Sequence, residues 1–496
     1  MYTKKEENLH ALIQSMSSSE KRFFKRFVKS RKENQNDYLS LFEALNSMKV
    51  YSRAELLKKV TSFNFHKHLE VKQHYLFQLL LDSLRQFRDS KLTLHNSLIE
   101  IDILIEKGLY HLAYKRIKSQ KHQAQQTDNF FYEIQLLQKE LSLARYLKEI
   151  DMRKNLKAIN NCYAKSENLL NYQQLYYDLC ELVEQNSFVR NSKQFKRFEV
   201  LKKHQLFNDV NKAKSFSGLY YFYLINYYYH ASTGENKTSY NYSVKMHKLI
   251  LGHAERAEGF SLMYLRAISA RFSTLILKGY KYDEYNLLMN ELKVYIRKIK
   301  DPEMQKIALS RVYQYQLIAF CREEKYLKAL DLLKDATLFV KENEILADGN
   351  AIKYLTFDIA KTYFITGQYV KANVWFLRTN YPDKLKRGCD IYAFSRILSL
   401  LCDIFLNQTE NVKYNALYLK RQLSKLAALF EFESFLITRI SQKFIYWNDC
   451  NNSEKIILLK EFIEELKTQL SNKWRTNTVL YFDFENWATN LLKAIA

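Results

Sequence analysis

The chain has 496 residues, a length that usually divides into several domains or repeats rather than one compact core. Hydrophobic residues make up 47% and charged residues 26%, which is usual for a folded protein and excludes a disordered one. With 9 glycines and 2 prolines, the sequence lacks the turn residues that a protein of many β-hairpins needs, so its composition predicts an all-α fold.

The formal net charge is +24, because 77 Lys and Arg residues stand against 53 Asp and Glu residues. An excess of this size indicates an acidic partner, such as nucleic acid, an anionic membrane surface or an acidic protein. It is also typical of compositional bias, since lysine rises together with tyrosine and phenylalanine while glycine and proline fall. Net charge reports on non-specific attraction and not on a site, so compositional bias is favoured over direct nucleic-acid binding.

Cysteine usage and the N-terminal residues predict a cytoplasmic protein. The six cysteines include no CxxC pair and are expected to be reduced thiols. The first residues, MYTKKEENLHALIQ, are charged and lack the apolar core of a signal peptide. The most hydrophobic run, LYYFYLINYYYHA at 219–231, is too short and too rich in tyrosine to span a bilayer, so no membrane insertion is expected. This run is expected to be a buried aromatic helix, with a base-stacking platform as the alternative.

Residues 1–92 are predicted to form an N-terminal helical module, with helices over 5–15, 17–32, 37–47, 53–60 and 68–88. Capping-box spacing marks the starts of the second and fourth helices, at Ser17-x-x-Glu20 and Ser52-x-x-Glu55. The second helix places the apolar Phe23, Phe24, Phe27 and Val28 on one side and Lys21, Lys25, Lys29 and Lys32 on the other, with Arg22 and Arg26 flanking.

This second helix has two interpretations. An amphipathic helix that buries its aromatics and leaves its cations in solvent is favoured, because such regular segregation normally marks a core-facing side. A basic helix laid on phosphates, with rings free to stack on bases, is the alternative. The helices over 37–47 and 53–60 are compatible with a helix-turn-helix, although nothing marks a recognition helix with Arg, Asn or Gln base readers. A DNA-reading regulator therefore stays open as a further alternative.

The sequence contains no motif for catalysis or cofactor binding. His66, Glu70 and His74 would share one helical face, with His68 close by, and could place two ligands on a metal. No further ligand stands at a familiar spacing, so a solvated face is favoured and no metal is expected. P-loop, GxGxxG, GxSxG and zinc-ribbon patterns are missing, and 9 glycines leave no loop able to surround a phosphate. We expect no cofactor and no enzyme.

Residues 93–475 are predicted to form a repeat. A bulky residue followed three positions later by another of the same helical face recurs at intervals of roughly 43 residues. The first members of these pairs are Tyr110, Met152, Phe195, Tyr240, Tyr282, Tyr326, Tyr369, Tyr414 and Ile456. A period in this range predicts an α-solenoid of about nine helical hairpins. Asp301 and Pro302 predict a helix start within it, and the segment 476–496 is expected to be a capping helix.

The segment AKTYFITGQYVKANVWF at 360–376 resembles the tetratricopeptide repeat. The resemblance lies in Ala360, Tyr363, Gly367, Tyr369, Ala372 and Phe376, and a second similar unit contains Phe320, Tyr326, Ala329, Leu333 and Ala336. The period of roughly 43 residues differs from the 34 typical of that family, so the repeat is tetratricopeptide-like. The phrases SMSSSEKRFFKRF and YLSLFEAL also resemble the start of bacterial helical-repeat proteins with no assigned activity.

The resemblance implies a non-enzymatic protein–protein interaction scaffold, in which the first helix of each hairpin lines a concave groove. Carried onto the two best units, it implies six partner-binding residues: Arg311, Gln314, Arg322, Tyr354, Phe357 and Lys361. A basic groove would prefer an acidic or helical segment of another protein. The alternative is a nucleic-acid-associated factor, with DNA or RNA as ligand, that uses Lys21, Arg22, Lys25 and Arg26.

Overall fold

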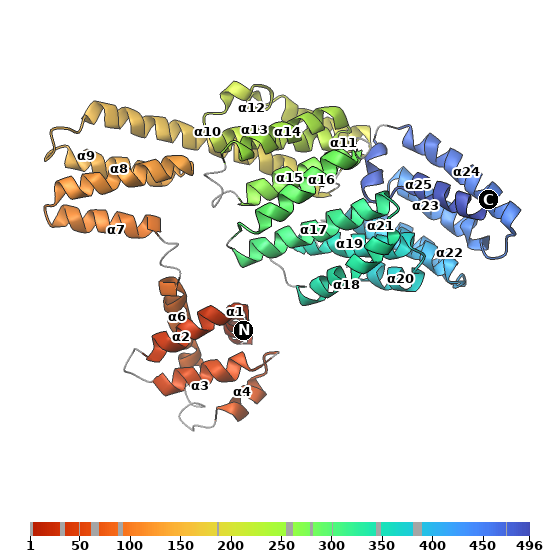
Figure 1. The fold of residues 1–496 in the computed structure, drawn as a ribbon, viewed down its shortest axis with the longest axis horizontal. Helices are drawn as coiled ribbons and strands as arrows, with labels where there is room; N and C mark the ends of the chain where they lie inside the picture. Colours follow the sequence, from red (N-terminus) through yellow and green to blue (C-terminus); the bar gives the residue numbers. More distant parts are fainter. Residues whose placement is uncertain are drawn as a thin grey trace. The chain divides into compact units, whose positions relative to one another are not determined.

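The computed structural model describes residues 3–29, 35–48, 50–60, 69–87, 93–185, 188–253, 261–277, 281–299, 301–343, 349–379, 389–472 and 474–496. Every regular element in these ranges is a helix, which confirms the all-α prediction (Figure 1). The chain divides into two compact units, the first built from residues 1–123 and 132–157 and the second from residues 124–131 and 158–496.

The first unit begins with the helices that the sequence predicts. Five of them lie in the first ninety residues, with ends within a few residues of the predicted ones: α1 (Thr3–Ser15), α2 (Ser18–Lys29), α3 (Gln35–Asn46), α4 (Arg53–Lys59) and α6 (Leu69–Phe87). The helices α7 (Thr93–Glu106), α8 (Tyr110–Gln126) and α9 (Phe130–Leu143) follow.

Helices α1, α2, α3 and α6 contact one another around a hydrophobic core of their own. Phe24 of α2 is fully buried, and its ring centroid lies 4.7 Å from that of Phe42 in α3. The aromatic side of α2 therefore faces inward, as the amphipathic interpretation expected. At the start of α2, Ser17 N donates to Glu20 Oε2 at 2.8 Å and Glu20 N donates to Ser17 Oγ at 3.3 Å, which confirms the capping box.

Ion pairs and a hydrogen bond link α7, α8 and α9. Arg116 of α8 lies 2.7 Å from Glu100 of α7, and Lys139 of α9 pairs with Asp102 of α7. Tyr132 of α9 donates its hydroxyl to the amide oxygen of buried Gln120 in α8 at 3.2 Å. Much of the charge on these helices is therefore used inside the unit.

The second unit continues the chain with α10 (Met152–Gln185), which starts in the first unit, and ends at α25 (Phe484–Ile495). Between them lie α11 (Ser192–Lys202), α12 (Gln205–Asn208), η1 (Val210–Lys212), α13 (Phe216–Ser232), α14 (Asn236–Leu251), α15 (Ser261–Leu277), α16 (Tyr282–Ile296), α17 (Pro302–Arg322), α18 (Tyr326–Glu342), α19 (Gly349–Ile365), α20 (Tyr369–Leu377), α21 (Cys389–Phe405), α22 (Val412–Lys425), α23 (Glu431–Gln442), η3 (Phe444–Tyr446), α24 (Asn452–Leu470) and η4 (Thr476–Leu480). From α13 to α23, each α-helix contacts the next, and each odd-numbered helix also contacts the next odd-numbered one.

Short turns with one left-handed residue join many of these helices. Such residues have φ between 52° and 83° and are Gly234, Glu324, Gly367, Asn407 and Ala427. After each, the next backbone N–H bonds to a carbonyl five residues earlier, as Gln368 N does to Tyr363 O at 2.9 Å. This is the Schellman motif, which satisfies the last carbonyls of one helix. After Gly234, Glu324 and Gly367 the next helix begins two residues later. This motif explains the Gly-x-Tyr spacing at Gly367.

The positions that define the repeat all lie in helices, at or near a start. Tyr110, Met152, Tyr282, Tyr326 and Tyr369 are the first residues of α8, α10, α16, α18 and α20, and Phe195, Tyr240, Tyr414 and Ile456 lie within the first five residues of α11, α14, α22 and α24. Ala360 and Ala372 have no exposed surface where α19 contacts α20. The segment 360–376 is therefore a packing element, as its small and aromatic residues suggested. The predicted N-cap Asp301 and first-turn Pro302 of α17 are confirmed.

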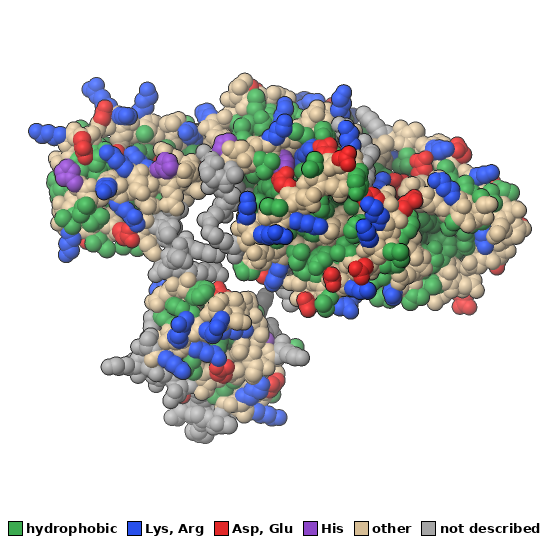
Figure 2. Space-filling view, in the orientation of Figure 1, with side chains coloured by type: hydrophobic (Ala, Val, Ile, Leu, Met, Phe, Trp, Pro, Cys, Tyr) green, Lys and Arg blue, Asp and Glu red, His purple; other side chains and the backbone are tan. Residues whose placement is uncertain are grey.

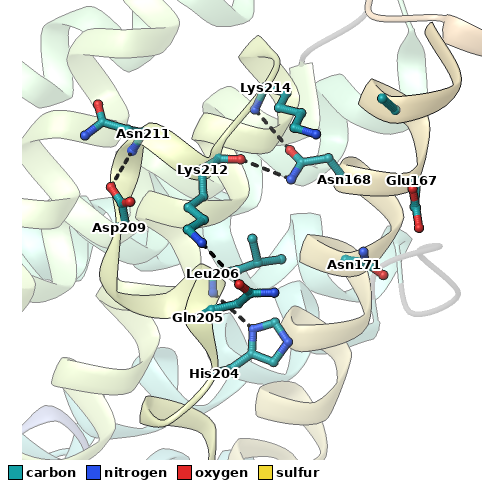
Figure 3. Close-up of a pocket in the computed structure, with 11 residues that line it drawn as sticks. Glu167, Asn168, Asn171, His204, Gln205, Leu206, Asp209, Asn211, Lys212 and Lys214 are labelled. Atoms are coloured by element: carbon teal, nitrogen blue, oxygen red, sulfur yellow. Dashed lines mark hydrogen bonds between the residues drawn. The ribbon is translucent and has the colours of Figure 1, made fainter. Parts of the chain in front are cut away.

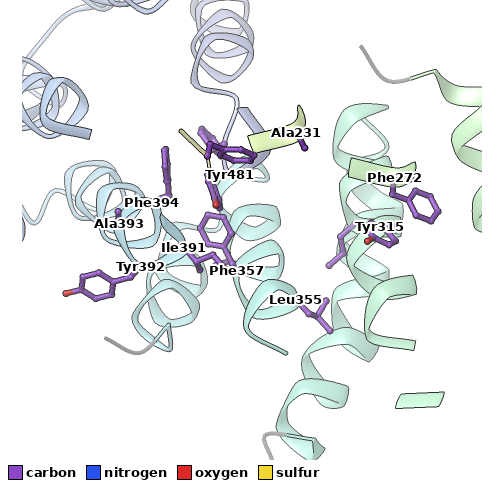
Figure 4. Close-up of a cluster of buried hydrophobic side chains, with 14 of the residues drawn as sticks. Ala231, Phe272, Tyr315, Leu355, Phe357, Ile391, Tyr392, Ala393, Phe394 and Tyr481 are labelled. Carbon is purple, nitrogen blue, oxygen red and sulfur yellow. The ribbon is translucent and has the colours of Figure 1, made fainter. Parts of the chain in front are cut away.

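The core of the second unit includes residues far apart in the sequence (Figure 4). The last part of the chain, residues 474–496, which we call the C-terminal segment, lies against several helices rather than one. The ring of Tyr481 stacks on Phe394 of α21 at 5.0 Å, and Phe482 meets Phe364 of α19 at 5.6 Å. Asn477 Nδ2 donates to the carbonyl oxygen of Ala231 in α13 at 2.8 Å. α25 itself contacts α24.

A buried ionic cluster connects Arg190, two residues before the start of α11, with α21 and α23. The guanidinium of Arg190 lies 3.3 Å from Asp390 and 3.2 Å from Glu433, and none of the three side chains is more than 4% exposed. Tyr481 donates its hydroxyl to Asp390 Oδ2 at 3.0 Å. Burial raises the pKa of the Glu433 carboxyl, while the charge of Arg190 opposes the rise.

Candidate functional site

Four polar side chains join α17 to α19 through two hydrogen bonds and an ion pair. Arg311 Nη1 donates to Gln314 Oε1 at 3.0 Å, and Gln314 Nε2 donates to Asp358 Oδ2 at 2.8 Å. Lys361 Nζ lies 2.5 Å from the other oxygen of Asp358. Asp358 is therefore shared between Gln314 and Lys361, with Arg311 bonded to the same glutamine. Three of the six groove residues expected from the resemblance, Arg311, Gln314 and Lys361, are brought together here.

The other residues of that set have different surroundings. Tyr354 is half-buried, and Arg311 Cζ lies 5.9 Å from the centroid of its ring. Phe357 is only 2% exposed and packs near Phe376 of α20, with ring centroids 6.1 Å apart (Figure 4). The structure places Phe357 in the core, which corrects its placement on a partner-binding surface. At position 357 the side chain of α19 is directed to the packed side of the helix pair.

Arg322 lies at the last residue of α17, three turns of helix beyond Arg311. Its Nη1 atom lies 3.5 Å from Asp483 Oδ2 in the C-terminal segment. The charge of Arg322 is therefore compensated within the chain, and it is not part of the group around Arg311.

A further cation, Arg266 of α15, lies close to α10 and α13. Its Cζ atom lies 5.7 Å from the ring centroid of Tyr176, and that ring meets Tyr221 of α13 at 5.5 Å. Guanidinium groups over aromatic faces are held by cation–π attraction. We call Tyr176, Tyr221, Arg266, Arg311 and Tyr354 the arginine–tyrosine row.

Tyr228 of α13 lies within the electrostatic influence of both arginines of this row. Burial raises the pKa of the Tyr228 phenol, and the charges of Arg266 and Arg311 oppose the rise. The groups that raise the pKa of Arg266 are all tyrosines: Tyr176, Tyr220, Tyr228 and Tyr221. Among the described residues, no carboxylate forms an ion pair with Arg266. A half-buried guanidinium surrounded by phenols rather than carboxylates favours an external anion.

The sequence interpretation missed Arg266, although the repeat carries the signal that finds it. Tyr354 follows Arg311 by roughly the repeat period, and Arg311 follows Arg266 by nearly the same interval. Tyr221 stands one further interval before Arg266. The row therefore consists of equivalent positions on α13, α15, α17 and α19, with Tyr176 added from α10.

The cations of α2 form a second candidate surface, in the first unit. Lys25 Nζ lies 2.6 Å from Glu43 of α3, and Arg22 Nε donates to the carbonyl of Ser18 at 3.3 Å. Lys21, Arg22 and Arg26 form no ion pair with any described residue. Figure 2 shows Lys and Arg side chains on this part of the surface with few Asp or Glu side chains among them.

A polar pocket of about 570 Å³ opens between α10 and the segment 204–214 (Figure 3). Asn168 of α10 fixes that segment, because its Nδ2 donates to Lys212 O and its Oδ1 accepts from Lys214 N, both at 3.0 Å. The lining carries both signs of charge, including Glu167, Asp209, Lys212 and Lys214. Such a mixture of positive and negative side chains is typical of a solvent-exposed pocket. The lining residues do not form a set of catalytic groups directed at one point.

Neither a metal cluster nor a membrane span is found among the described residues. No group of three or more His, Cys, Asp or Glu side chains there could hold a metal ion. His66 and His68 lie outside the described residues, and Glu70 is 3.9 Å from Arg53.

Burial raises the pKa of the Cys321 thiol to about 11, so it is not an activated nucleophile. In the part of the chain that is described, no helix has both the length and the apolar character to cross a bilayer.

We compared the chain with protein-family models, curated proteins and solved structures, and none of the three comparisons gave a match.

Proposed function

We propose that the chain is a non-enzymatic scaffold that binds an acidic segment of another protein. In this proposal the second unit is the main part of a tetratricopeptide-like α-solenoid of about nine hairpins. The contacts of each helix with the next, and of odd-numbered helices with one another, support such stacking. The first helices of the hairpins then line the concave surface, which is where the arginine–tyrosine row would lie.

The observation that carries the proposal is the uncompensated charge of Arg266 within the arginine–tyrosine row. Arg266 has tyrosines as neighbours and no carboxylate partner among the described residues, while Asp358 is shared between Gln314 and Lys361. Carboxylates of a partner would supply the missing counter-charge, and Tyr354 adds the kind of aromatic anchor that is enriched at interfaces.

The test is binding of a short glutamate-rich peptide, compared with its glutamine counterpart, to the full chain. We expect the acidic peptide to bind more tightly, and the variant R266Q/R311Q to weaken its binding by about tenfold or more. The control K328Q/K460Q removes two exposed cations from α18 and α24 and should leave binding nearly unchanged. If both variants weakened peptide binding equally, the effect would come from the loss of net charge. That result would contradict a binding site at the arginine–tyrosine row.

Nucleic-acid association is a second candidate function, favoured by the unpaired cations of α2. Lys21, Arg22 and Arg26 have no acidic partner among the described residues and could neutralise phosphates. If they do, the variant K21Q/R22Q/R26Q should show a shallower plot of the logarithm of the DNA or RNA binding constant against the logarithm of salt concentration. The slope should fall by about one unit for each lost phosphate contact.

The matched control for that test is K193Q/K328Q/K460Q, which removes the same charge from exposed positions of the second unit. A slope that changes equally in both variants, or no binding at low salt, excludes α2 as the anchor. Nucleic-acid binding that survives in the α2 variant while R266Q/R311Q abolishes it would instead assign the phosphate contacts to the arginine–tyrosine row.

A further inference from the structure

Apolar side chains line the solvent side of α10 at every seventh position. Leu156, Tyr163, Leu170 and Tyr177 are 49%, 54%, 63% and 63% exposed. We call these four residues the α10 seam. The opposite side of the same helix is buried and includes Ile159, Tyr172, Leu175 and Leu179. The α10 helix is therefore apolar on two sides, and the described residues cover only one of them.

The seven-residue spacing keeps the seam on one face of the helix. An α-helix turns so that residues seven apart drift by only about 20°, so four such positions stay on one face over about 31 Å. Between them lie the exposed polar residues Asn160, Glu167 and Gln174. Scattered exposed apolar residues need no explanation, but four at a strict seven-residue interval indicate a packing partner.

The charges beside the seam identify that partner. Exposed Arg153 and Lys157 stand near the start of the helix, and exposed Asp178 and Glu181 stand near its end. None of the four forms an ion pair with a described residue. A parallel pair of α10 helices would place like charges together, whereas an antiparallel pair places the basic start of one against the acidic end of the other.

We propose that α10 is a self-association surface, where two copies of the chain pair antiparallel through the α10 seam. With the two-fold axis between Tyr163 and Leu170, each Tyr163 meets the other copy's Leu170. In the same register Leu156 lies against Tyr177, and Lys157 lies near Asp178. Such a contact is isologous, because one surface serves both copies and the assembly closes as a dimer.

The first experiment measures the mass of the full chain in solution over a range of concentrations by light scattering. We expect a monomer–dimer equilibrium that the variant L170E shifts to monomer, with at least a tenfold weaker dimer and unchanged helicity, because Leu170 is exposed. The control L327E changes an 84% exposed leucine of α18 and should leave the dimer intact. A monomeric wild-type chain at all concentrations, or a dimer that survives in L170E, overturns the proposal.

Charge exchange tests the identity and direction of the partner. K157E and D178K should each weaken the dimer, and the double variant K157E/D178K should restore it, because the exchanged charges meet again across the two-fold axis. Disulfide trapping gives an independent readout: L156C/Y177C should cross-link two chains, while L156C alone should not. Cross-linking by L156C alone would show a parallel pair and overturn the antiparallel arrangement.

Discussion

The left-handed residues at the helix turns differ in how much strain their side chains bring. Gly367 adopts φ 74° without cost, and a Cβ there would meet no atom within 4 Å. Ala427 adopts φ 52° although it carries a Cβ. A left-handed backbone conformation costs a residue with a Cβ roughly 1–2 kcal/mol of folding free energy. Glycine avoids this cost but loses more conformational entropy on folding, which offsets about half of its advantage over alanine.

These two turns give a reciprocal prediction. We expect Gly367→Ala to lower the free energy of unfolding by about 1 kcal/mol and Ala427→Gly to raise it by about 0.5–1 kcal/mol. Urea denaturation of the full chain measures both. Asn407→Gly is the control and should change stability less, because asparagine tolerates the left-handed region. Changes of the same sign at Gly367 and Ala427 would contradict a backbone origin.

The buried cluster of Arg190, Asp390 and Glu433 predicts a second stability effect at the scale of single residues. Arg190→Met leaves two buried carboxylates without their cation, and we expect it to cost about 3–5 kcal/mol near pH 8. Thermal or chemical unfolding measures the loss. The triple variant R190M/D390N/E433Q should recover much of it, because it removes the unpaired charges.

The pH dependence of this cluster has a definite sign. The pKa of Glu433 is raised above its ordinary value of 4.5 by burial, so folding favours the protonated form. The stability that this proton contributes is therefore complete below pH 4.5 and is lost as the pH rises through the raised value. Arg190 opposes the rise, so R190M should raise the pKa of Glu433 further and make the total loss with rising pH larger than in the wild type. A variant whose deficit does not change between pH 5 and 8 would contradict this account.

At the scale of elements, the C-terminal segment is a structural part of the second unit. Phe482 is 5% exposed and lies 4.8 Å from Phe484 and 5.6 Å from Phe364 of α19. We expect Phe482→Ala to cost about 3–5 kcal/mol, because it leaves a cavity between helices that no neighbour can fill. Lys493→Ala, at an exposed position of α25, should stay within about 0.5 kcal/mol of the wild type. Equal effects of both in denaturant unfolding would show that the segment is dispensable.

The helices themselves could be predicted from local patterns. The amphipathic side of α2, the capping box at Ser17 and Glu20, and the Asp301–Pro302 start of α17 all depend on residues a few positions apart. Gly367 marks its turn because it adopts a positive φ. Periodicity and caps are local, so the sequence alone determines them well.

The contacts of the C-terminal segment could not be predicted in the same way. Asn477 bonds to Ala231, which lies 246 positions earlier, and Arg190 meets Asp390 across 200 positions. No local pattern specifies such pairs, because each depends on how many helices stack in between. For the same reason Phe357 was placed on a surface although it is buried, and Arg266 was missed although it stands about one repeat interval before Arg311.

At the scale of the whole molecule, the described residues include two hydrophobic clusters that share no member. One contains residues of α1, α2, α3 and α6, and the other contains residues from α10 to α25. Because the described members of one cluster are not members of the other, loss of packing in one should unfold mainly the helices around it. Stability in such a chain is a set of local values rather than a single one.

Hydrogen exchange after two matched substitutions tests this division. Phe24→Ala removes a fully buried ring from the first cluster, and Phe394→Ala removes one from the second. We expect each to cost about 3–5 kcal/mol locally. Exchange should rise in α1–α6 for the first variant and in α19–α24 for the second, with the other set unchanged. Phe131→Ala, at a 74% exposed ring, serves as control. If Phe24→Ala raised exchange in α19–α24 as strongly as in α1–α6, the chain would unfold as one cooperative body, and separate clusters would have no separate stability.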